Sequence, residues 1–187
     1  MVYYRYLFKN MKSLSPNEGL VYSALLSHSL MTSEHFDVDG NFDVGLAKTF
    51  IADNLETYGV ECIDLNPVST RKLSKVLGMK EDTIRRIKLD LRQKHHLISS
   101  AYIICPPELL GKGYIDIPSG TRLKGRQLTF YGLLKDRSSR YDGVIDTWTS
   151  RLADMAGIEN TNAHKLIAEL QKKGYVKRLD DGKLKIL

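Results

Sequence analysis

Two short runs of basic, amide and hydroxyl side chains stand at corresponding places in two similar stretches of the chain. An arginine can donate two hydrogen bonds to O6 and N7 of guanine, and an asparagine can pair with N6 and N7 of adenine in the same bidentate way. The first run is the more charged and the second is richer in amides. The residues with this chemistry are Lys80, Asp82, Thr83 and Arg86 in the first run, and Asn160, Thr161, Asn162 and Lys165 in the second.

The first run opens a predicted helix. Apolar residues at Ile84, Ile87 and Leu91 are spaced i, i+3, i+7, which is one face of a helix. A shorter apolar pattern before them stops at Gly78, a residue suited to the left-handed conformation that ends helices. Two helices joined by a short turn containing glycine predict a helix-turn-helix over residues 70–98. In this motif the first turns of the second helix meet base edges.

The same pattern returns 79 residues later, where Leu152 corresponds to Leu73 and Gly157 to Gly78. Apolar residues fall on apolar residues at every core position of the second copy, and Asn160 is expected to cap its second helix. Such a repeat favours two tandem helix-turn-helix units over two unrelated helical hairpins. A strand pattern follows each copy.

Local signals place the remaining elements. Helices are expected at 15–31, 45–58 and 126–136, the first opened by a capping box at Ser15 and Glu18. Strands are expected at 2–8, 60–65, 100–105, 114–117, 144–147, 175–179 and 183–187. The strands at 100–105 and 114–117 are expected to form a wing after the first helix-turn-helix, and the last two strands a hairpin that ends the chain.

This layout resembles the winged helix-turn-helix superfamily, over residues 70–187 and 15–31. Its tandem arrangement is similar to that of plasmid and phage replication initiator proteins. The resemblance implies a mainly α fold with small β wings (α+β), in which the third helix of each unit enters the DNA major groove. The expected domains are 1–118, with an insertion at 32–66 that departs from the family pattern, a linker at 119–125, and 126–187. Residues expected to touch phosphates are Arg71, Lys72, Lys112, Lys177, Arg178, Lys183 and Lys185.

The formal charge of the chain, +6, is unevenly spread. Residues 32–66 contain eight acids and one base, whereas residues 67–102 contain nine bases and three acids, and residues 103–187 fifteen bases and ten acids. Basic charge therefore collects on the two helix-turn-helix stretches, where a polyanion is the natural partner. Double-stranded DNA is the expected partner.

Other classes of function find little support in the sequence. The histidines show no metal-ligand spacing with Cys62 and Cys105, which are expected to be buried thiols, and no nucleophile motif occurs. Neither a signal peptide nor a membrane-spanning run is expected, which indicates a cytoplasmic protein. The resemblance to plasmid and phage replication initiators implies a bacterial, nucleoid-associated protein. We expect no enzyme activity, no cofactor and no metal.

The acidic insertion at 32–66 leaves alternatives open. Residues 36–44 alternate around Asp39-Gly40, which predicts a hairpin; their acids resemble the start of a calcium loop, but Phe42 and Lys48 stand where that loop needs glycine and glutamate. The insertion, or the strand at 2–8, could pair with a second copy or another protein. The functions considered are a transcription regulator or replication initiator, and alternatively a winged-helix interaction scaffold such as a chromosome-segregation accessory protein.

Overall fold

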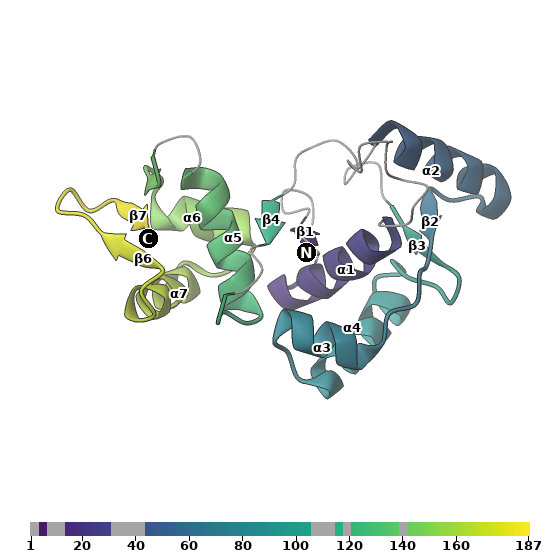
Figure 1. The fold of residues 1–187 in the computed structure, drawn as a ribbon, viewed down its shortest axis with the longest axis horizontal. Coiled ribbons are helices and arrows are strands. Elements are labelled where there is room, and N and C mark those ends of the chain that lie inside the picture. The colour runs from purple at the N-terminus through teal and green to yellow at the C-terminus, as the bar shows by residue number, and fades with distance from the viewer. Residues whose placement is uncertain (1–3, 7–13, 31–43, 106–114, 118–120, 139–141) are drawn as a thin grey trace. The chain divides into compact units, whose positions relative to one another are not determined.

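The structure, a computed structural model, describes residues 4–6, 14–30, 44–105, 115–117, 121–138 and 142–187. Seven helices and seven short strands lie in this described part (Figure 1). The protein is mainly helical with small antiparallel sheets, which confirms the predicted α+β class. Among the described residues, no helix has the length and apolar character that a bilayer crossing requires. Contacts divide the chain into a middle unit, residues 20–112, and a terminal unit, residues 1–19 with 113–187.

Helix α1 (Pro16–Leu30) begins at the predicted capping box. The amide of Ser15 donates to Oε2 of Glu18 at 2.7 Å, and the amide of Glu18 donates to Oγ of Ser15 at 3.4 Å. Each side chain thus satisfies an amide that the first turn of a helix leaves unpaired. Residues 20–26 of α1 are all buried, so this helix supplies much of the core of the middle unit.

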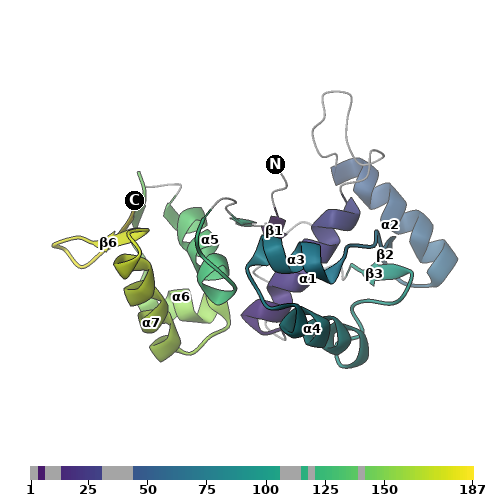
Figure 2. The same ribbon diagram turned by 60° about the horizontal axis from the view of Figure 1, so that its bottom comes forward.

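Helices α3 (Thr70–Leu77) and α4 (Glu81–Gln93) follow each other across a tight turn, as predicted. The turn is possible because Gly78 has φ 62°, a left-handed conformation in which a side chain would be strained. Both helices run beside α1 in the two views (Figures 1 and 2). Their buried apolar residues are Leu73, Leu77, Ile84, Ile87 and Leu91.

The strands of the middle unit pair differently from the prediction. Strand β2 (Cys62–Asp64) pairs antiparallel with β3 (Tyr102–Ile104), and Ile98 makes a single bridge to β3. Strand β3 therefore lies between β2 and the segment that leaves α4. The prediction that 100–105 and 114–117 pair as a wing is wrong. Sequence signals mark where a strand lies, but the partner of so short a strand depends on the packing of the whole unit.

The second of those strands belongs to the terminal unit. There β4 (Ile115–Ile117) pairs antiparallel with β1 (Tyr4–Tyr6) and lies against α5 (Arg126–Ser138). This pairing explains why residues 1–19 group with the C-terminal part of the chain. The division by contacts falls after Lys112, whereas the sequence suggested a linker at 119–125.

The rest of the terminal unit repeats the helix–turn–helix order. Its three-stranded sheet has the order β5-β7-β6, with all pairs antiparallel, so the last strand lies in the centre. Gly157, at φ 57°, makes the turn between the two helices as Gly78 does in the middle unit. The elements are β5 (Val144–Ile145), α6 (Thr149–Ala156), α7 (Asn160–Lys172), β6 (Val176–Arg178) and β7 (Leu184–Ile186).

The two units thus share one order of elements: a helix, a strand, two helices, and two extended segments of which the last pairs with the first strand. The middle unit differs by α2 (Val44–Tyr58), which confirms the helix predicted within the insertion. Nδ2 of Asn54 in α2 donates to the carbonyl of Cys62 at 3.1 Å, which ties the helix to β2. The predicted hairpin at 36–44 lies outside the described residues except for its last residue.

Candidate nucleic-acid interface

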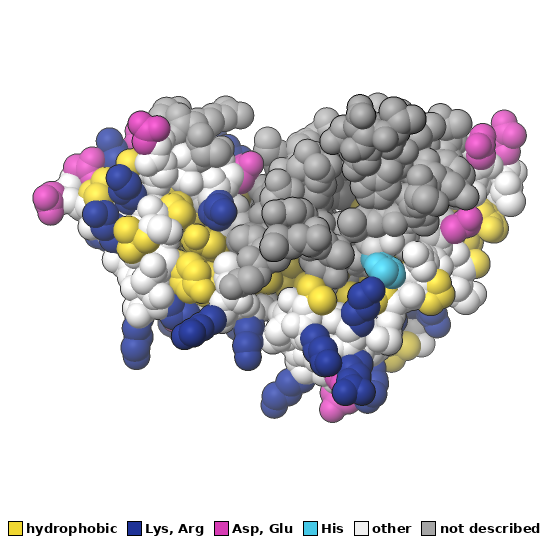
Figure 3. Space-filling view, viewed as in Figure 1, with side chains coloured by type: hydrophobic (Ala, Val, Ile, Leu, Met, Phe, Trp, Pro, Cys, Tyr) yellow, Lys and Arg dark blue, Asp and Glu magenta, His cyan; other side chains and the backbone are white. Residues whose placement is uncertain are grey.

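The outer face of α4 carries Asp82 and Arg86, two of the four base-reading candidates of the middle unit. Helix α4 buries Ile84, Ile87 and Leu91 against the unit, which turns the opposite face to solvent. Figure 3 shows Lys and Arg side chains gathered over the α3–α4 part of this unit. The exposed residues of that face are Asp82, Arg85, Arg86, Leu89, Arg92 and Gln93.

Two neighbouring arginines on this face have different surroundings. The guanidinium of Arg85 lies 2.9 Å from Oδ1 of Asp82 and 3.4 Å from Oε2 of Glu81, so both acids of the first turn offset its charge. Arg86 is exposed and pairs with no carboxylate in the described part of the chain. An exposed, unpaired guanidinium can turn its two-pronged donor face to an external acceptor. Arg86 is therefore the better placed of the two to donate to an external acceptor.

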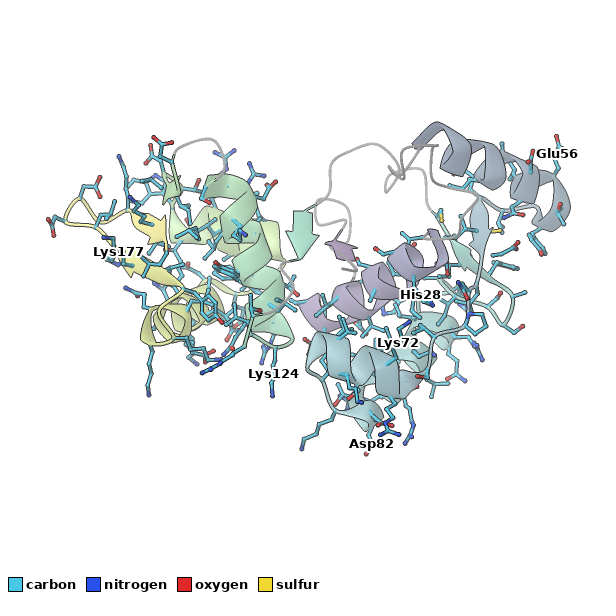
Figure 4. The ribbon with its side chains drawn as sticks, in the orientation of Figure 1. His28, Glu56, Lys72, Asp82, Lys124 and Lys177 are labelled. Carbon is cyan, nitrogen blue, oxygen red and sulfur yellow. The ribbon has the colours of Figure 1, made fainter. Side chains whose placement is uncertain are left out.

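The other three predicted base-reading residues of this unit surround the start of α4. Lys80 stands at the N-cap position and is exposed, and its side chain makes no capping hydrogen bond. Asp82 has 92% of its side chain exposed, at the helix tip labelled in Figure 4. Thr83 is only half-buried. The structure therefore brings all four residues to one end of one helix.

The N-terminus of α3 supplies the predicted phosphate contacts Arg71 and Lys72, both exposed. The helix is capped by Ser69, whose hydroxyl oxygen accepts from the amide of Lys72 at 3.1 Å. His28 of α1 lies near Lys72 (Figure 4). Burial and the Lys72 charge lower the pKa of His28 below its usual value. The imidazole of His28 is therefore neutral down to a lower pH than that of an ordinary histidine. The positive charge at this end of α3 comes from Lys72.

Helix α7 presents the second predicted set in the terminal unit. It buries Ala163, Leu166, Ile167 and Leu170, and its first turn carries the amides. Asn160, Thr161 and Lys165 are exposed and Asn162 is half-buried. The expectation that Asn160 caps this helix is wrong, because Glu159 takes the N-cap position and Asn160 begins the helix. The side-chain amide of Asn160 therefore does not cap the helix.

The hairpin of β6 and β7 carries the predicted phosphate contacts of the terminal unit. Lys177, labelled in Figure 4, and Arg178 are exposed, and the Arg178 guanidinium donates to the carbonyl of Gly182 at 2.9 Å. Nζ of Lys183 lies 3.3 Å from Asp181 and 4.0 Å from Asp146, so two acids already surround it. Lys185 is half-buried, and Lys112 lies outside the described residues.

Sequence reasoning missed two features of these surfaces. Leu89 does not fit the apolar spacing of α4 and is exposed among arginines; that misfit was the signal that could have found it. Two exposed basic residues, Arg122 and Lys124 (Figure 4), also lie where the sequence suggested only a linker, and the exposed Arg126 begins α5 directly after them. Their close spacing in the sequence was the available sign.

No group of three or more His, Cys, Asp and Glu side chains that could hold a metal ion occurs among the described residues. Comparison of the chain with protein-family models, with curated proteins and with solved structures finds no match. The interpretation of these surfaces therefore depends on the residues and the geometry given above.

Proposed function

We propose that the protein binds double-stranded DNA through two winged helix-turn-helix units, as a transcription regulator or as a replication initiator of the plasmid and phage kind. The observation that carries the proposal is the repeated order of elements. In each unit, two helices joined at a left-handed glycine are followed by segments that pair with a preceding strand. A winged helix is built in this order, and its second turn-linked helix is the one that reads DNA.

The polarity of the outer faces supports the same reading. Arg86 in α4 and Lys165 in α7 occupy corresponding positions, 79 residues apart, on the solvent side of each helix. An exposed basic residue one turn into a helix can reach a guanine in the major groove. Exposed lysines and arginines on the α3 terminus and the β6–β7 hairpin would then contact phosphates, which fix position and carry no sequence information.

One observation favours the alternative, a scaffold that binds proteins. Leu55 and Tyr58 of α2 are exposed, at 44% and 41%, beside the exposed acids Asp53 and Glu56. An acidic helix with apolar side chains suits a protein partner or a second copy better than DNA. Because α2 is separate from α4, the two surfaces can serve two partners, and we assign this one to self-association or a protein partner.

The proposal is tested by two single-charge variants measured on the best duplex from a random pool and on random duplex. Arg86→Ala is expected to weaken binding to the selected duplex by about 1–3 kcal/mol and to relax preference at one base pair. Lys177→Ala, the matched control, is expected to weaken both duplexes equally, because it contacts a phosphate. If both variants lose equally on both duplexes, α4 does not read bases. If the protein binds no duplex, the proposal is wrong.

A further inference from the structure

Leu89 is out of place on the outer face of α4. The other apolar residues of this helix with large side chains are at most 5% exposed, whereas Leu89 is 50% exposed. It stands three residues after Arg86 and three before Arg92, and so lies on the same side of the helix as both. A leucine side chain exposed to water buries little apolar surface at this position, and a polar side chain would be better solvated there. The apolar group is therefore suited to a partner surface that combines apolar and negatively charged groups.

The same position is apolar in the terminal unit. Ala168 corresponds to Leu89 and is exposed on α7, between Lys165 and Gln171, which correspond to Arg86 and Arg92. Both helices thus present a basic residue, then an apolar one three positions later, then a polar or basic one. An alanine is too short to reach as far as a leucine. The repeat indicates one type of partner surface for both helices, contacted more deeply by α4.

The major groove of DNA offers such a surface. On the base edges in this groove, the apolar group is the C5-methyl of thymine, and phosphates flank it on both sides. We propose that Leu89 is a specificity residue that contacts a thymine methyl group. This inference depends on the proposed DNA binding and adds a named base to it.

The helix geometry fixes the neighbourhood of that thymine. Three residues of α-helix rise by about 4.5 Å, and successive base pairs are about 3.4 Å apart. If Arg86 reads a guanine, Leu89 reaches the next base pair or the one after it. The selected duplex should therefore contain a thymine within two base pairs of that guanine, on either strand.

The test removes the methyl group from the DNA and the side chain from the protein. Each thymine of the selected duplex is replaced in turn by deoxyuridine, which lacks only the C5-methyl. For the unaltered protein, one replacement near the guanine is expected to lower affinity about fourfold, the value of one buried methyl group. Leu89→Ala is expected to bind the unmodified duplex more weakly by at least that factor and to show no further loss on deoxyuridine, because interacting partners are not additive.

Leu187→Ala is the matched control, since Leu187 is 62% exposed after β7 and loses the same atoms. Its duplex affinity and its sensitivity to deoxyuridine should equal those of the unaltered protein. Alanine favours helix, so Leu89→Ala should not unfold α4, and Leu187 lies outside the helices.

Three outcomes would overturn the inference. If deoxyuridine has no effect at any position while the duplex is still bound, no methyl group is read and the proposed function stands. If Leu89→Ala keeps the full deoxyuridine effect, another residue reads the methyl group. If Leu89→Ala changes the mass of the protein in solution, a second copy occupies this face. Failure to bind any duplex would instead remove the proposed function itself.

Discussion

The N-cap residue of the first helix differs between the two helix–turn–helix units in whether its side chain can accept a hydrogen bond. Ser69 accepts a hydrogen bond from the amide of Lys72, whereas Trp148, at the corresponding position, makes no side-chain cap and is 85% exposed. A serine or aspartate cap stabilises a helix by roughly 1 kcal/mol relative to a residue that cannot accept. Trp148 therefore leaves its helix start less stable than the same site in the middle unit.

This difference predicts opposite effects of two substitutions. Trp148→Ser is expected to raise the free energy of unfolding by about 1 kcal/mol, and Ser69→Ala to lower it by a similar amount. Urea unfolding followed by circular dichroism measures both, because Trp148 is the single tryptophan of the chain and its removal abolishes the fluorescence signal. A loss of stability in Trp148→Ser would mean that the indole packs in a way that its exposure does not indicate.

A second residue-scale prediction concerns the buried thiols. Burial raises the pKa of Cys105 from 9.0 to about 12, and the pKa of Cys62 is also raised. The unfolded chain loses its thiol proton near pH 9 and the folded chain does not, so the unfolded state binds fewer protons between pH 9 and 12. The stability contributed by Cys105 should therefore be complete below pH 9 and fall as pH rises through this range, by about 1.4 kcal/mol per pH unit. The raised pKa of Cys62 acts in the same direction.

The measurement is the free energy of unfolding from pH 8 to pH 10, below the range where Tyr22, whose pKa is raised well above 10.0, adds its own effect. Cys105→Ala should show a shallower fall than the unaltered protein, whatever stability it loses overall. An equal slope in the variant would show that Cys105 does not titrate as its burial requires.

At the scale of elements, the helices and the hairpin of β6 with β7 could be predicted from sequence, whereas the partners of strands distant in the chain could not. The spacing of Ile84, Ile87 and Leu91 repeats with the helical period, so α4 is specified by residues close to one another. Strands β1 and β4 are three residues each and lie more than a hundred residues apart in the chain. The residues in and near either strand therefore do not indicate with which strand it pairs.

The candidate site follows the same division. Lys80, Asp82 and Arg86 could be found because their positions follow from where α4 begins. Leu89 was missed because the sequence interpretation followed charged, amide and hydroxyl side chains, although the misfit of Leu89 with the apolar spacing of α4 already placed it on the outer face. The capping role expected for Asn160 failed by one residue, because Glu159 takes the N-cap position although its side chain makes no capping hydrogen bond.

The left-handed turn between α6 and α7 gives a prediction at this scale. Gly157 has φ 57°, and a Cβ built on it would meet no heavy atom within 4 Å. Gly157→Ala should therefore destabilise the protein by about 1–2 kcal/mol through backbone strain alone. Gly157→Asn should cost less, because asparagine tolerates this conformation. Thermal unfolding of the two variants compares them; equal losses would indicate a steric cause in place of a conformational one.

At the scale of the whole molecule, charge is divided between the two units. The middle unit holds eleven bases and twelve acids and the terminal unit seventeen bases and ten acids, which gives formal charges of −1 and +7. General attraction to a polyanion should therefore come mainly from the terminal unit. In the middle unit, the acids of the insertion offset the basic α3–α4 surface.

The position of those acids predicts the effect of removing them. Glu56 lies on α2, at the opposite side of the middle unit from Asp82 (Figure 4). Asp53→Asn with Glu56→Gln should therefore change duplex affinity less than twofold, and a change of mass in solution would identify α2 as an association surface. A large gain in affinity would mean that these acids compete with DNA. The insertion acids Glu34, Asp37, Asp39 and Asp43 lie outside the described residues and can be replaced by amides in a second variant.

The central claim, that two helix–turn–helix units bind duplex DNA, is tested most directly by affinity as a function of salt. Each phosphate neutralised by a lysine or arginine releases about 0.9 counterion. If about six exposed basic side chains contact phosphates, a plot of log K against log salt concentration should have a slope near −5. A slope near zero, or no binding at about 50 mM salt, would contradict the claim.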